Sequence, residues 1–467
     1  MTVERKARII CTLGPSSSSA EVLEGMMRAG MDVARLNFSH GTHEEHRARV
    51  NLIRKVSKKV GKPIALLQDV QGPKVRLGKF SAGVAEVVAG QKVTLTTRNV
   101  LGNKDVLPTP IKTMPRDVKK GDPVLLDDGR VRLQVLGVKG PDIFCQVLIG
   151  GTLKDKKGIN LPGAAVSVPT ITAKDIDDLE FGQELGVDFV ALSFVRSAKD
   201  LHKAREYVKK LNTPLIAKIE KPQAVADLDA IAEASDGIMI ARGDLGVEMP
   251  LEKLPGIQKS SVTAANARGG LVIVATEMLE SMVNSPRPTR AEVSDVANAI
   301  YDGADAVMLS GETAAGKYPI EAIRMMSNIV IEAERQNPTR PMPYQATNDI
   351  STGIAAAAVN AADRLGAAAI IAFTESGMTA RLISELRPRS RIVALTPHPA
   401  MLRRMAMYWG VTGRVAPRFT STDAMIHAVH RLCRKEDWAK KGQTVVIVAG
   451  TPLNQTGNTN LMTIRRF

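Results

Sequence analysis

The stretch PLIAKIE (residues 214–220) is a short apolar run with charged residues near its end. Its length and its β-branched residues are typical of a strand, and alternation along a strand places Lys218 and Glu220 on the same face. Seven further runs share this length and composition: RIICTLG (8–14), DVARLNF (32–38), IALLQDV (64–70), FVALSF (189–194), GIMIARGD (237–244), LVIVATE (271–277) and AVMLSGE (306–312).

Amphipathic segments separate most of these runs, as in SAEVLEGMMRAG (19–30) and KDIDDLEFGQELG (174–186). Strands that alternate with helices predict a parallel sheet. Eight such units predict an α/β fold built on a (β/α)8 barrel, formed by residues 1–72 and 170–341.

Residues 73–169 interrupt this alternation. Segments such as AEVVAGQKVTLTT (85–97) and DIFCQVLIGGTL (142–153) alternate apolar and polar residues between turns, which predicts an inserted antiparallel β domain. We expect this domain to lie on a loop at the barrel mouth, where it could close over a site as a lid and exclude water.

A further α/β domain with an open sheet is predicted over residues 345–467, after the Pro-rich linker NPTRPMPY (337–344). Its strand-like runs are AAAIIAFTESG (367–377), SRIVALTPHP (390–399) and QTVVIVAGTP (443–452).

Each run of the predicted barrel carries a polar residue at or near its C-terminal end. In a (β/α)8 barrel these ends converge on one mouth, where enzymes of this fold hold their chemistry. The alternative is that polar residues only mark the places where strands meet loops, but their recurrence in every run favours a site. The residues are Thr12, Asn37, Asp69, Ser193, Glu220, Asp244, Thr276 and Glu312.

Lys218, Glu220 and Asp244 are the main candidates for chemistry. A Lys at the mouth suits a transferring phosphoryl group, and two carboxylates suit Mg²⁺, or Mn²⁺, with room left for substrate oxygens. Asp244 follows Arg242 and Gly243 at a predicted turn whose backbone N–H groups can face an anion. Hard oxygen donors without a His/Cys cluster argue against zinc. The alternative interpretation of Lys218 and Glu220 is a structural ion pair.

The composition argues against several classes of function. The net charge of +15 is spread along the chain and aromatic residues make up only 3%, so we expect no nucleic-acid partner. No apolar stretch approaches the ~18 residues of a membrane span, and the N-terminus lacks the apolar core of a signal peptide. Three scattered cysteines, Cys11, Cys145 and Cys433, indicate a reducing compartment, so a cytoplasmic location is expected.

The segment GETAAGKY (311–318) nearly matches the phosphate-binding P-loop pattern. Its last position is Tyr318, which cannot place a small hydroxyl on Mg²⁺. We therefore interpret this segment as a loop between a strand and a helix.

Longer motifs resemble the pyruvate kinase family along essentially the whole chain. The resemblance implies Mg²⁺-dependent phosphoryl transfer from phosphoenolpyruvate to ADP, giving pyruvate and ATP in glycolysis. It also implies the barrel, the inserted lid, the C-terminal domain and, usually, a homotetramer. The motifs are ARLNFSHGTHEEH (34–46), AKIEKPQAV (217–225), DGIMIARGDLGVE (236–248), VATEMLESM (274–282), PRPTRAEVSDVANAIYDGADAVMLSGETAAGKYP (286–319) and GTPLNQTGNTN (450–460).

The resemblance assigns roles to residues of the predicted mouth. Arg35 looks like the guanidinium that grips the phosphoryl group, and Lys218 like the cation that stabilises its charge during transfer. Gly243 and Asp244 resemble the carboxylate-binding end of the site, and Thr276 the threonine on the proton route to pyruvate.

The nucleotide side is assigned by resemblance as well, to Asn37, His40 and Arg76. One departure lies beside Thr276, because Glu277 stands where many relatives have Gln. The electrostatics at that position are therefore left open.

The segment QDVQGPKVRLG (68–78) departs from the potassium-dependent members of the family, in which a K⁺ ion lies near the Asp. Asp69, Asn37 and Ser39 resemble the K⁺ ligands. However, Val70 replaces a Thr, Gln71 a Lys, Leu77 a Thr, and Lys74 a Glu. We predict that the Lys74 ammonium replaces the ion, so that K⁺ is not required. The alternative is a solvated lysine at the lid hinge with K⁺ still needed.

The segment FTESGMT (373–379) leads from a predicted strand into a helix. Thr374, Ser376 and Thr379, with the helix N-terminus, form a candidate allosteric site for a phosphorylated effector, as relatives have at the matching loop. Ordinary helix capping by these hydroxyls is the alternative.

Two rival functions remain open at this point. A Mg²⁺-dependent barrel lyase acting through an enolate would share Lys218, Glu220 and Asp244 but would need neither nucleotide nor lid. A catalytically inactive binding protein would be expected to have lost Lys218 or Glu220, and both are present.

Overall fold

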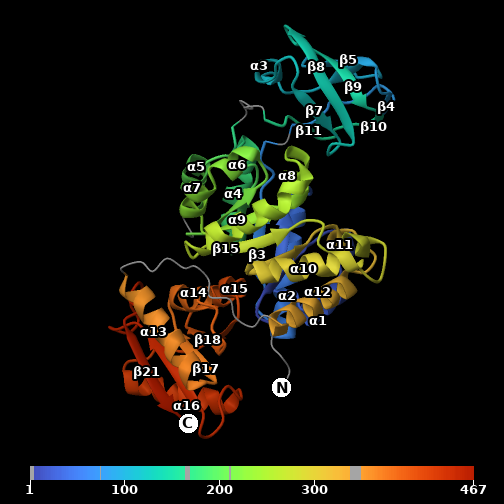
Figure 1. Cartoon of the computed structure of the whole chain (residues 1–467). Coiled ribbons are helices and arrows are strands. Elements are labelled where there is room, and N and C mark those ends of the chain that lie inside the picture. The colour runs from blue at the N-terminus through green and yellow to red at the C-terminus, as the bar shows by residue number, and fades with distance from the viewer. Residues whose placement is uncertain (1–4, 74, 164–168, 210–211, 337–348) are drawn as a thin grey trace.

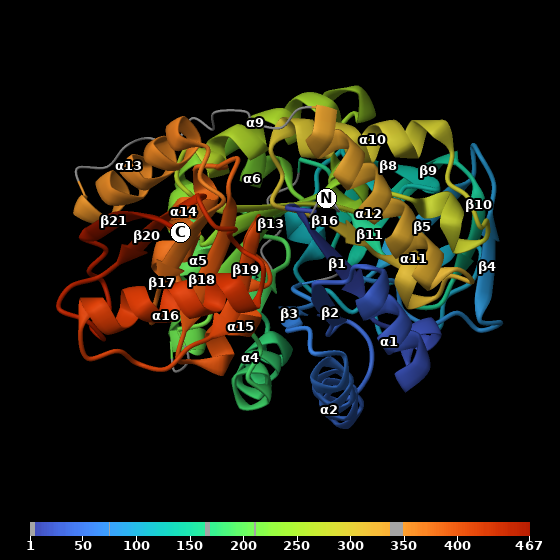
Figure 2. The same ribbon diagram turned by 90° about the horizontal axis from the view of Figure 1, so that it is seen from below.

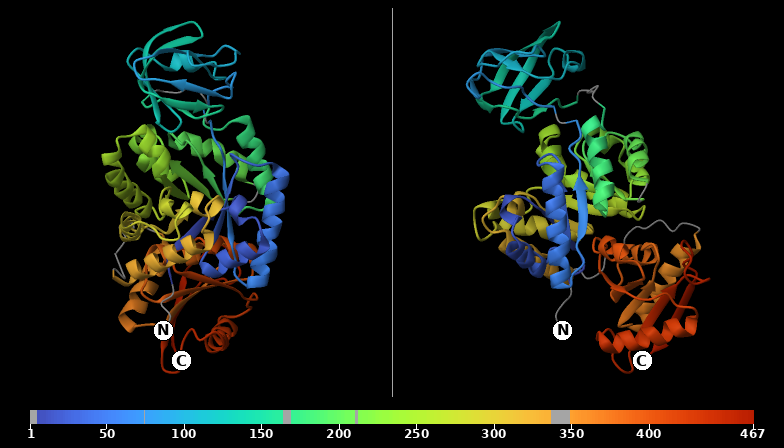
Figure 3. Two further views of the ribbon diagram at one scale, coloured as in Figure 1. Left: turned by 90° about the vertical axis from the view of Figure 1, so that its right-hand side faces the viewer. Right: turned by 180° about the vertical axis from the view of Figure 1, so that it is seen from behind.

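The computed structural model describes residues 5–73, 75–163, 169–209, 212–336 and 349–467. A central barrel has the inserted β domain at one end and the C-terminal domain at the other (Figure 1). Two further views show the same order of the three parts (Figure 3). Within the described part of the chain, no helix is both long and apolar enough to cross a membrane.

Eight parallel strands close into a barrel in the order β1-β16-β15-β14-β13-β12-β3-β2. Each of the eight apolar runs contains one of these strands, which confirms the predicted (β/α)8 barrel. The strands are β1 (Arg8–Thr12), β2 (Val33–Asn37), β3 (Ala65–Asp69), β12 (Phe189–Leu192), β13 (Leu215–Ile219), β14 (Gly237–Ala241), β15 (Leu271–Ala275) and β16 (Ala306–Leu309).

Alternation along each strand divides its side chains between the barrel interior and the outer helices. Ile10 of β1 is buried in one cluster with Met239 of β14 and Ile273 of β15. The flanking Ile9 and Cys11 are equally buried, but they belong to the cluster that contains the helix residues. Both faces of the strands are dry, which explains why the runs are apolar throughout.

Some of the barrel helices begin at side chains that satisfy their free N–H groups. Thr42, Thr172 and Thr289 each accept the N–H of a carboxylate residue three positions on, as a capping box requires. The helices are α1 (Ala20–Ala29), α2 (His43–Val60), α4 (Ala173–Leu185), α5 (Ala198–Val208), α6 (Pro222–Ala226), α7 (Leu228–Ala234), α8 (Arg242–Glu248), α9 (Leu254–Asn266), α10 (Arg290–Asp302), α11 (Gly311–Ala314) and α12 (Pro319–Gln336).

One predicted run is longer than its strand. Strand β14 ends at Ala241, and Arg242, Gly243 and Asp244 form the first turn of helix α8 instead of a strand end or an open turn. An acidic residue in a first helical turn is favourable because the helix N-terminus carries partial positive charge. Asp244 is therefore presented to the mouth by a helix.

The inserted domain has a core of its own and two small sheets, with strand orders β10-β4 and β11-β7-β8-β9-β5-β6. The pairs are antiparallel as predicted, except that β5 and β6 are parallel. The elements are β4 (Val84–Val87), β5 (Lys92–Thr96), β6 (Val106–Pro108), α3 (Met114–Asp117), β7 (Pro123–Leu126), β8 (Val131–Lys139), β9 (Asp142–Ile149), β10 (Gly151–Lys154) and β11 (Ile159–Asn160).

The C-terminal domain is an open sheet in the order β19-β18-β17-β20-β21, with β21 antiparallel at one edge. Helices α13 and α16 lie on opposite faces of this sheet (Figure 2). Strands β19 and β21 were not among the predicted runs. The elements are α13 (Ile350–Leu365), β17 (Ala369–Phe373), α14 (Met378–Glu385), β18 (Arg391–Thr396), α15 (Pro399–Met405), β19 (Val411–Val415), α16 (Thr422–Lys435), β20 (Thr444–Ala449) and β21 (Leu461–Arg466).

Charged contacts join the C-terminal domain to the barrel end opposite the inserted domain. Arg387 pairs with Asp305 at 2.7 Å, and both side chains are buried. Arg381 of α14 donates to the carbonyl oxygen of Gly269, just before β15, at 2.6 Å. Helix α14 is therefore anchored directly on the barrel.

Candidate active site

Lys218 lies at the centre of a group of polar side chains at the C-terminal ends of β3, β12 and β13. Its Nζ is 2.7 Å from Glu220 Oε1 and 3.3 Å from Asp69 Oδ1. It also donates to Ser193 Oγ at 2.8 Å, and the Ser193 hydroxyl donates to Asp69 Oδ1 at 3.2 Å. Lys218 and Glu220 thus share one side of their strand end, as alternation predicts.

Arg35 reaches the same group from β2. Its Nε lies 2.7 Å from Asp69 Oδ2, and its Nη1 donates to Thr12 Oγ1 at 2.9 Å. Asp69 therefore has a cation on each of its two oxygens. The structure brings together four of the eight polar strand ends here: Thr12, Asp69, Ser193 and Glu220.

The charges at this site shift one another's pKa. Burial alone would raise the pKa of Asp69, but Lys218 and Arg35 hold it below its ordinary value. Burial alone would lower the pKa of Lys218, but Asp69 and Glu220 hold it above its ordinary value. Lys218 is therefore an ammonium ion at neutral pH and acts as a positive charge rather than as a base.

Glu220 and Asp244 supply the two carboxylates predicted to hold a divalent metal ion. Oε2 of Glu220 accepts the backbone N–H of Phe194 at 2.8 Å. Burial and the negative charge of Asp244 raise the pKa of Glu220, although Lys218 opposes this shift. Two hard-oxygen donors that repel each other fit a small divalent cation, which would relieve the repulsion.

Thr276 and Gly243 form a second part of the mouth. The Gly243 N–H donates to Thr276 Oγ1 at 2.7 Å, and the Thr276 hydroxyl donates to the carbonyl oxygen of Ala275 at 2.6 Å. This N–H, predicted to face an anion, is bonded to Thr276 here. Thr276 and Glu277 have φ angles of 70° and 53°, a conformation that costs free energy for residues other than glycine.

Arg242 holds this strained turn. Its Nη2 donates to the carbonyl oxygen of Thr276 at 2.9 Å, and its Nη1 pairs with Asp295 at 2.6 Å. Sequence reasoning gave Arg242 no role. Its place directly before Gly243 was a signal, but the contact with Thr276 depends on the neighbouring position of β14 and β15.

The candidate K⁺ ligands surround the end of β3. Asn37 is paired in register with Asp69, and Asn37 Oδ1 accepts the N–H of Ser39 at 3.1 Å. Val70 is buried, and its N–H donates to the carbonyl oxygen of Ala191 at 3.1 Å. Lys74, which we predict to fill this pocket, lies outside the described residues.

The predicted nucleotide-side residues lie on two different parts of the molecule. His40 follows β2, and its carbonyl oxygen lies 3.0 Å from Nε2 of His46. Arg76 lies at the start of the inserted domain. Its backbone forms an isolated antiparallel β-bridge with Gly158, and its Nη1 donates to the carbonyl oxygen of Lys156 at 3.2 Å.

The last polar strand end, Glu312, does not belong to the site. Its carboxylate accepts the N–H groups of Leu279 at 3.0 Å and Ser310 at 2.7 Å. Glu312 therefore stabilises the loops after β15 and β16.

A cleft of about 1310 Å³ lies between the inserted domain and the barrel beside α8. Its lining includes Arg132 and Leu148 from the inserted domain, and Arg242, Gly243 and Glu277 from the mouth. The cleft therefore borders Arg242 and Gly243, the two residues that are hydrogen-bonded to Thr276.

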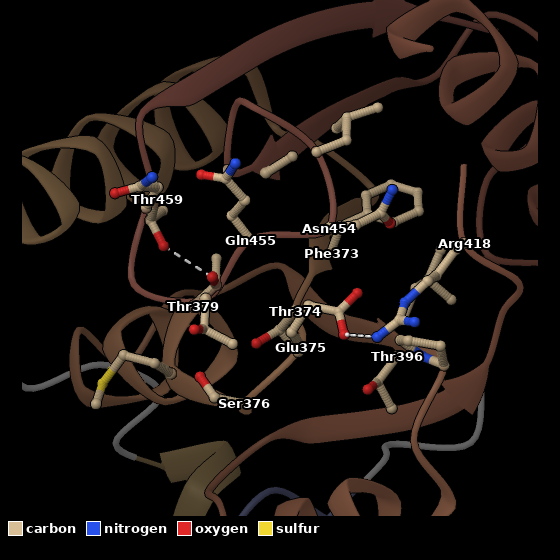
Figure 4. Close-up of a pocket in the computed structure, with 18 of the residues that line it drawn as sticks. Phe373, Thr374, Glu375, Ser376, Thr379, Thr396, Arg418, Asn454, Gln455 and Thr459 are labelled. Atoms are coloured by element: carbon tan, nitrogen blue, oxygen red, sulfur yellow. Dashed lines mark hydrogen bonds and ion pairs between the residues drawn. The ribbon is translucent and has the colours of Figure 1, made fainter. Parts of the chain in front are cut away.

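A separate pocket in the C-terminal domain contains Thr374, Ser376 and Thr379 in its lining, together with Arg418, as Figure 4 shows. Arg418 pairs with Glu375 at 3.2 Å across this pocket. Helix α14 begins at Gly377, which has no side chain to cap it, and the Thr374 hydroxyl accepts the N–H of Gly377 at 2.8 Å. This local bond is of the kind that the capping alternative describes, so the effector site stays a prediction. Sequence reasoning missed Arg418, which comes from a distant loop.

Comparison with protein families identifies both large parts of the chain. Residues 4–323 match the family described as pyruvate kinase, barrel domain. Residues 352–465 match the family described as pyruvate kinase, alpha/beta domain.

Individual relatives match over nearly the full length. The chain is 45% identical to a pyruvate kinase of Mycobacterium intracellulare, over 100% of this chain and 99% of that protein. It is 44% identical to a pyruvate kinase of Geobacillus stearothermophilus, over 99% of this chain and 80% of that protein. A crystal structure of a pyruvate kinase from Cryptosporidium parvum superposes with a TM-score of 0.93 at 37% identity, covering 99% of this chain and 96% of that one.

Proposed function

Because this chain belongs to the pyruvate kinase family, we propose that its barrel mouth transfers a phosphoryl group from phosphoenolpyruvate to ADP, giving pyruvate and ATP. The observation that carries this proposal is the Lys218 ammonium, fixed between Asp69 and Glu220 with Arg35 beside it. A rival lyase would share several of these residues, but matches along the whole chain favour the phosphotransferase.

Lys218 and Arg35 supply the positive charge that the transferring group needs. Charge builds up on the phosphoryl oxygens during transfer, and fixed cations in a dry site stabilise it without reorganising. The guanidinium of Arg35 offers two parallel N–H groups to phosphate oxygens. The Asp69 carboxylate holds both cations in position before the substrate arrives.

Glu220 and Asp244 would hold a divalent metal ion, Mg²⁺ by our proposal. When bound, the ion supplies positive charge next to the phosphoryl oxygens. Glu220 is held by Lys218 and by the N–H of Phe194, so its carboxylate is oriented in advance. The organic acid's carboxylate is assigned to the start of α8, at Gly243 and Asp244.

Thr276 is assigned to the proton that converts the enolate into pyruvate. Its hydroxyl bonds Gly243, the residue assigned to the carboxylate end, so it lies next to the proposed acid. Asn37, His40 and Arg76 are assigned to the nucleotide side by resemblance. A glycolytic role, a cytoplasmic location and a homotetrameric assembly stay predictions of the sequence.

Regulation through the C-terminal pocket is a further part of the proposal. An uncapped helix start, three hydroxyl residues and Arg418 suit a phosphate group. Arg381, in the first half of α14, donates to the carbonyl oxygen of Gly269, so the helix that begins at the pocket also contacts the barrel.

Lys218→Met should lower turnover with phosphoenolpyruvate and ADP by about a hundredfold or more, because it removes one charge from the transition state. The variant should still fold and bind Mg²⁺, with a lower thermal midpoint because Asp69 and Glu220 lose a partner, as circular dichroism and metal titration can check. Lys203→Met, on the exposed face of α5, is the matched control and should behave like the wild type. Near-normal turnover in Lys218→Met would refute the assignment.

Thr276→Ala should slow proton exchange at the pyruvate methyl group more than it weakens substrate binding, because a hydroxyl near the enolate matters chiefly when the proton moves. Tritium or deuterium exchange, compared with the KM values, measures both effects. Thr276→Ser keeps the hydroxyl and serves as the control. A rise in KM alone would make Thr276 a binding residue.

Catalysis should need Mg²⁺ but not K⁺ if Lys74 fills the monovalent-cation pocket. Activity is measured in a buffer whose only monovalent cation is a bulky quaternary ammonium ion. Lys74→Glu should create K⁺ dependence or cripple the enzyme without K⁺, whereas Lys79→Glu, at an exposed site, should not. Strong stimulation of the wild type by K⁺ would contradict the prediction.

A panel of phosphorylated sugars and AMP should contain an activator of the wild type. Ser376→Asp should abolish that activation, since a carboxylate repels phosphate, while Ser376→Ala should keep part of it. Initial rates at subsaturating phosphoenolpyruvate provide the measurement. If no compound activates the wild type, the regulatory site is removed from the proposal.

A further inference from the structure

The two chain segments that connect the barrel to the inserted domain meet at one buried carboxylate, that of Asp175. The outgoing segment contributes Gly72, whose N–H donates to Asp175 Oδ1 at 2.9 Å. The returning segment contributes Thr172, whose N–H and hydroxyl donate to Asp175 Oδ2 at 2.8 and 2.6 Å. The Asp175 side chain is fully buried. Both connections are therefore bonded to the same group.

The barrel side of this junction is tightly packed. Gly72 has a φ of 66°, and a Cβ atom there would lie 2.9 Å from the Phe194 ring. Ile171, next to Thr172, is buried in the core between strands and helices. Neither connecting segment can shift at Asp175 without breaking hydrogen bonds or packing.

The inserted domain begins and ends close to this junction. Val75 and Leu161 belong to its separate core, and the N–H of Ile159 donates to the carbonyl oxygen of Val75 at 2.9 Å. Arg76, assigned to the nucleotide side, directly follows Val75. Asp175 therefore lies where the connections to this domain meet the barrel, a few residues from Arg76 in the outgoing segment.

We propose that Asp175 is a positioning residue that fixes the pivot of the inserted domain and so determines how the domain closes over the nucleotide. The carboxylate suits this task because each of its oxygens accepts hydrogen bonds from a different connecting segment. Asp175 touches neither substrate in this account. The inference rests on the proposed function and on the lid role that the sequence predicts for the inserted domain.

A matched group exists in the next helix of the barrel. Asp200 closes the capping box of α5, where it accepts the N–H groups of Ser197 at 3.1 Å and Arg196 at 2.9 Å. Both donors are neighbours of that helix, and neither is one of the residues that bond Asp175. A variant at Asp200 therefore reports the cost of a damaged cap alone.

Asp175→Asn tests the proposal. The side-chain amide of Asn has only one oxygen that can accept hydrogen bonds. When this oxygen accepts the bonds of Thr172 at the start of α4, the NH₂ group of the amide faces the Gly72 N–H. The hydrogen bond between Gly72 and residue 175 is then lost. We expect kcat/KM for ADP to fall about tenfold, because a hydrogen bond to a charged acceptor is lost. The Kd for phosphoenolpyruvate, bound by barrel residues, should stay within about twofold. Hydrogen exchange of the Gly72 amide should accelerate by a similar factor.

Asp200→Asn is the control, because it weakens a cap while leaving the bonds of Gly72 and Thr172 to Asp175 in place. It should lower the thermal midpoint but leave the kinetics with ADP unchanged. Asp175→Ser, which can cap α4 but cannot reach both segments, replaces Asp175→Asn if the latter does not fold. Equal kinetic effects at Asp175 and Asp200, or none at Asp175, would overturn the proposal. An inactive wild type would instead refute the proposed function.

Discussion

The buried ammonium of Lys218 and the carboxylates of Asp69 and Glu220 are the interaction on which the barrel mouth depends. Charges taken out of water are tolerated only when each is paired and hydrogen-bonded, and removing one partner leaves the others uncompensated. The partners come from β3 and β13, which are neighbours of β12 on either side. Their pairing is complete only when the barrel is closed. This buried group of charges therefore depends on an apolar sheet, and that sheet in turn holds the cations ready for the anionic substrate that we propose.

Backbone strain occurs at the same mouth, as it does in several loops elsewhere in the described chain. Phe194, Thr276 and Glu277 have positive φ angles although none is a glycine, and such residues cost on the order of 1–3 kcal/mol each. At Phe194 this conformation accompanies an N–H directed at Glu220, and at Thr276 a carbonyl oxygen directed at Arg242. The rigid strands behind these residues keep the conformations in place. The strain thus orients a candidate metal ligand and a candidate proton-transfer residue.

The two domains at the ends of the barrel are attached in different ways. The connections to the inserted domain are bonded to Asp175, Asn160 of the domain donates to Glu248 of α8 at 2.9 Å, and a cleft lies beside that helix. The C-terminal domain instead contacts the barrel through a buried ion pair between Arg387 and Asp305 and through Arg381. Two connecting segments that meet at one carboxylate suit the lid role predicted for the inserted domain, and a charged interface suits the regulatory role that we propose for the C-terminal domain.

The sequence by itself determined the architecture and identified most of the candidate site residues, because both follow from local patterns. Apolar runs with polar ends specify parallel strands whose ends converge, and Lys218, Glu220, Asp244 and Thr276 were identifiable from those runs alone. The inserted domain and the open sheet were predicted from changes in the alternation of apolar and polar residues along the chain. The short strand β19 and the edge strand β21 were not predicted. What only the tertiary structure decided are contacts between segments far apart in the chain: Arg242 on the Thr276 turn, Arg418 in the C-terminal pocket, and Asp175 on Gly72. Hydrogen bonds and ion pairs of this kind depend on side-chain directions and strand register, which no local pattern encodes.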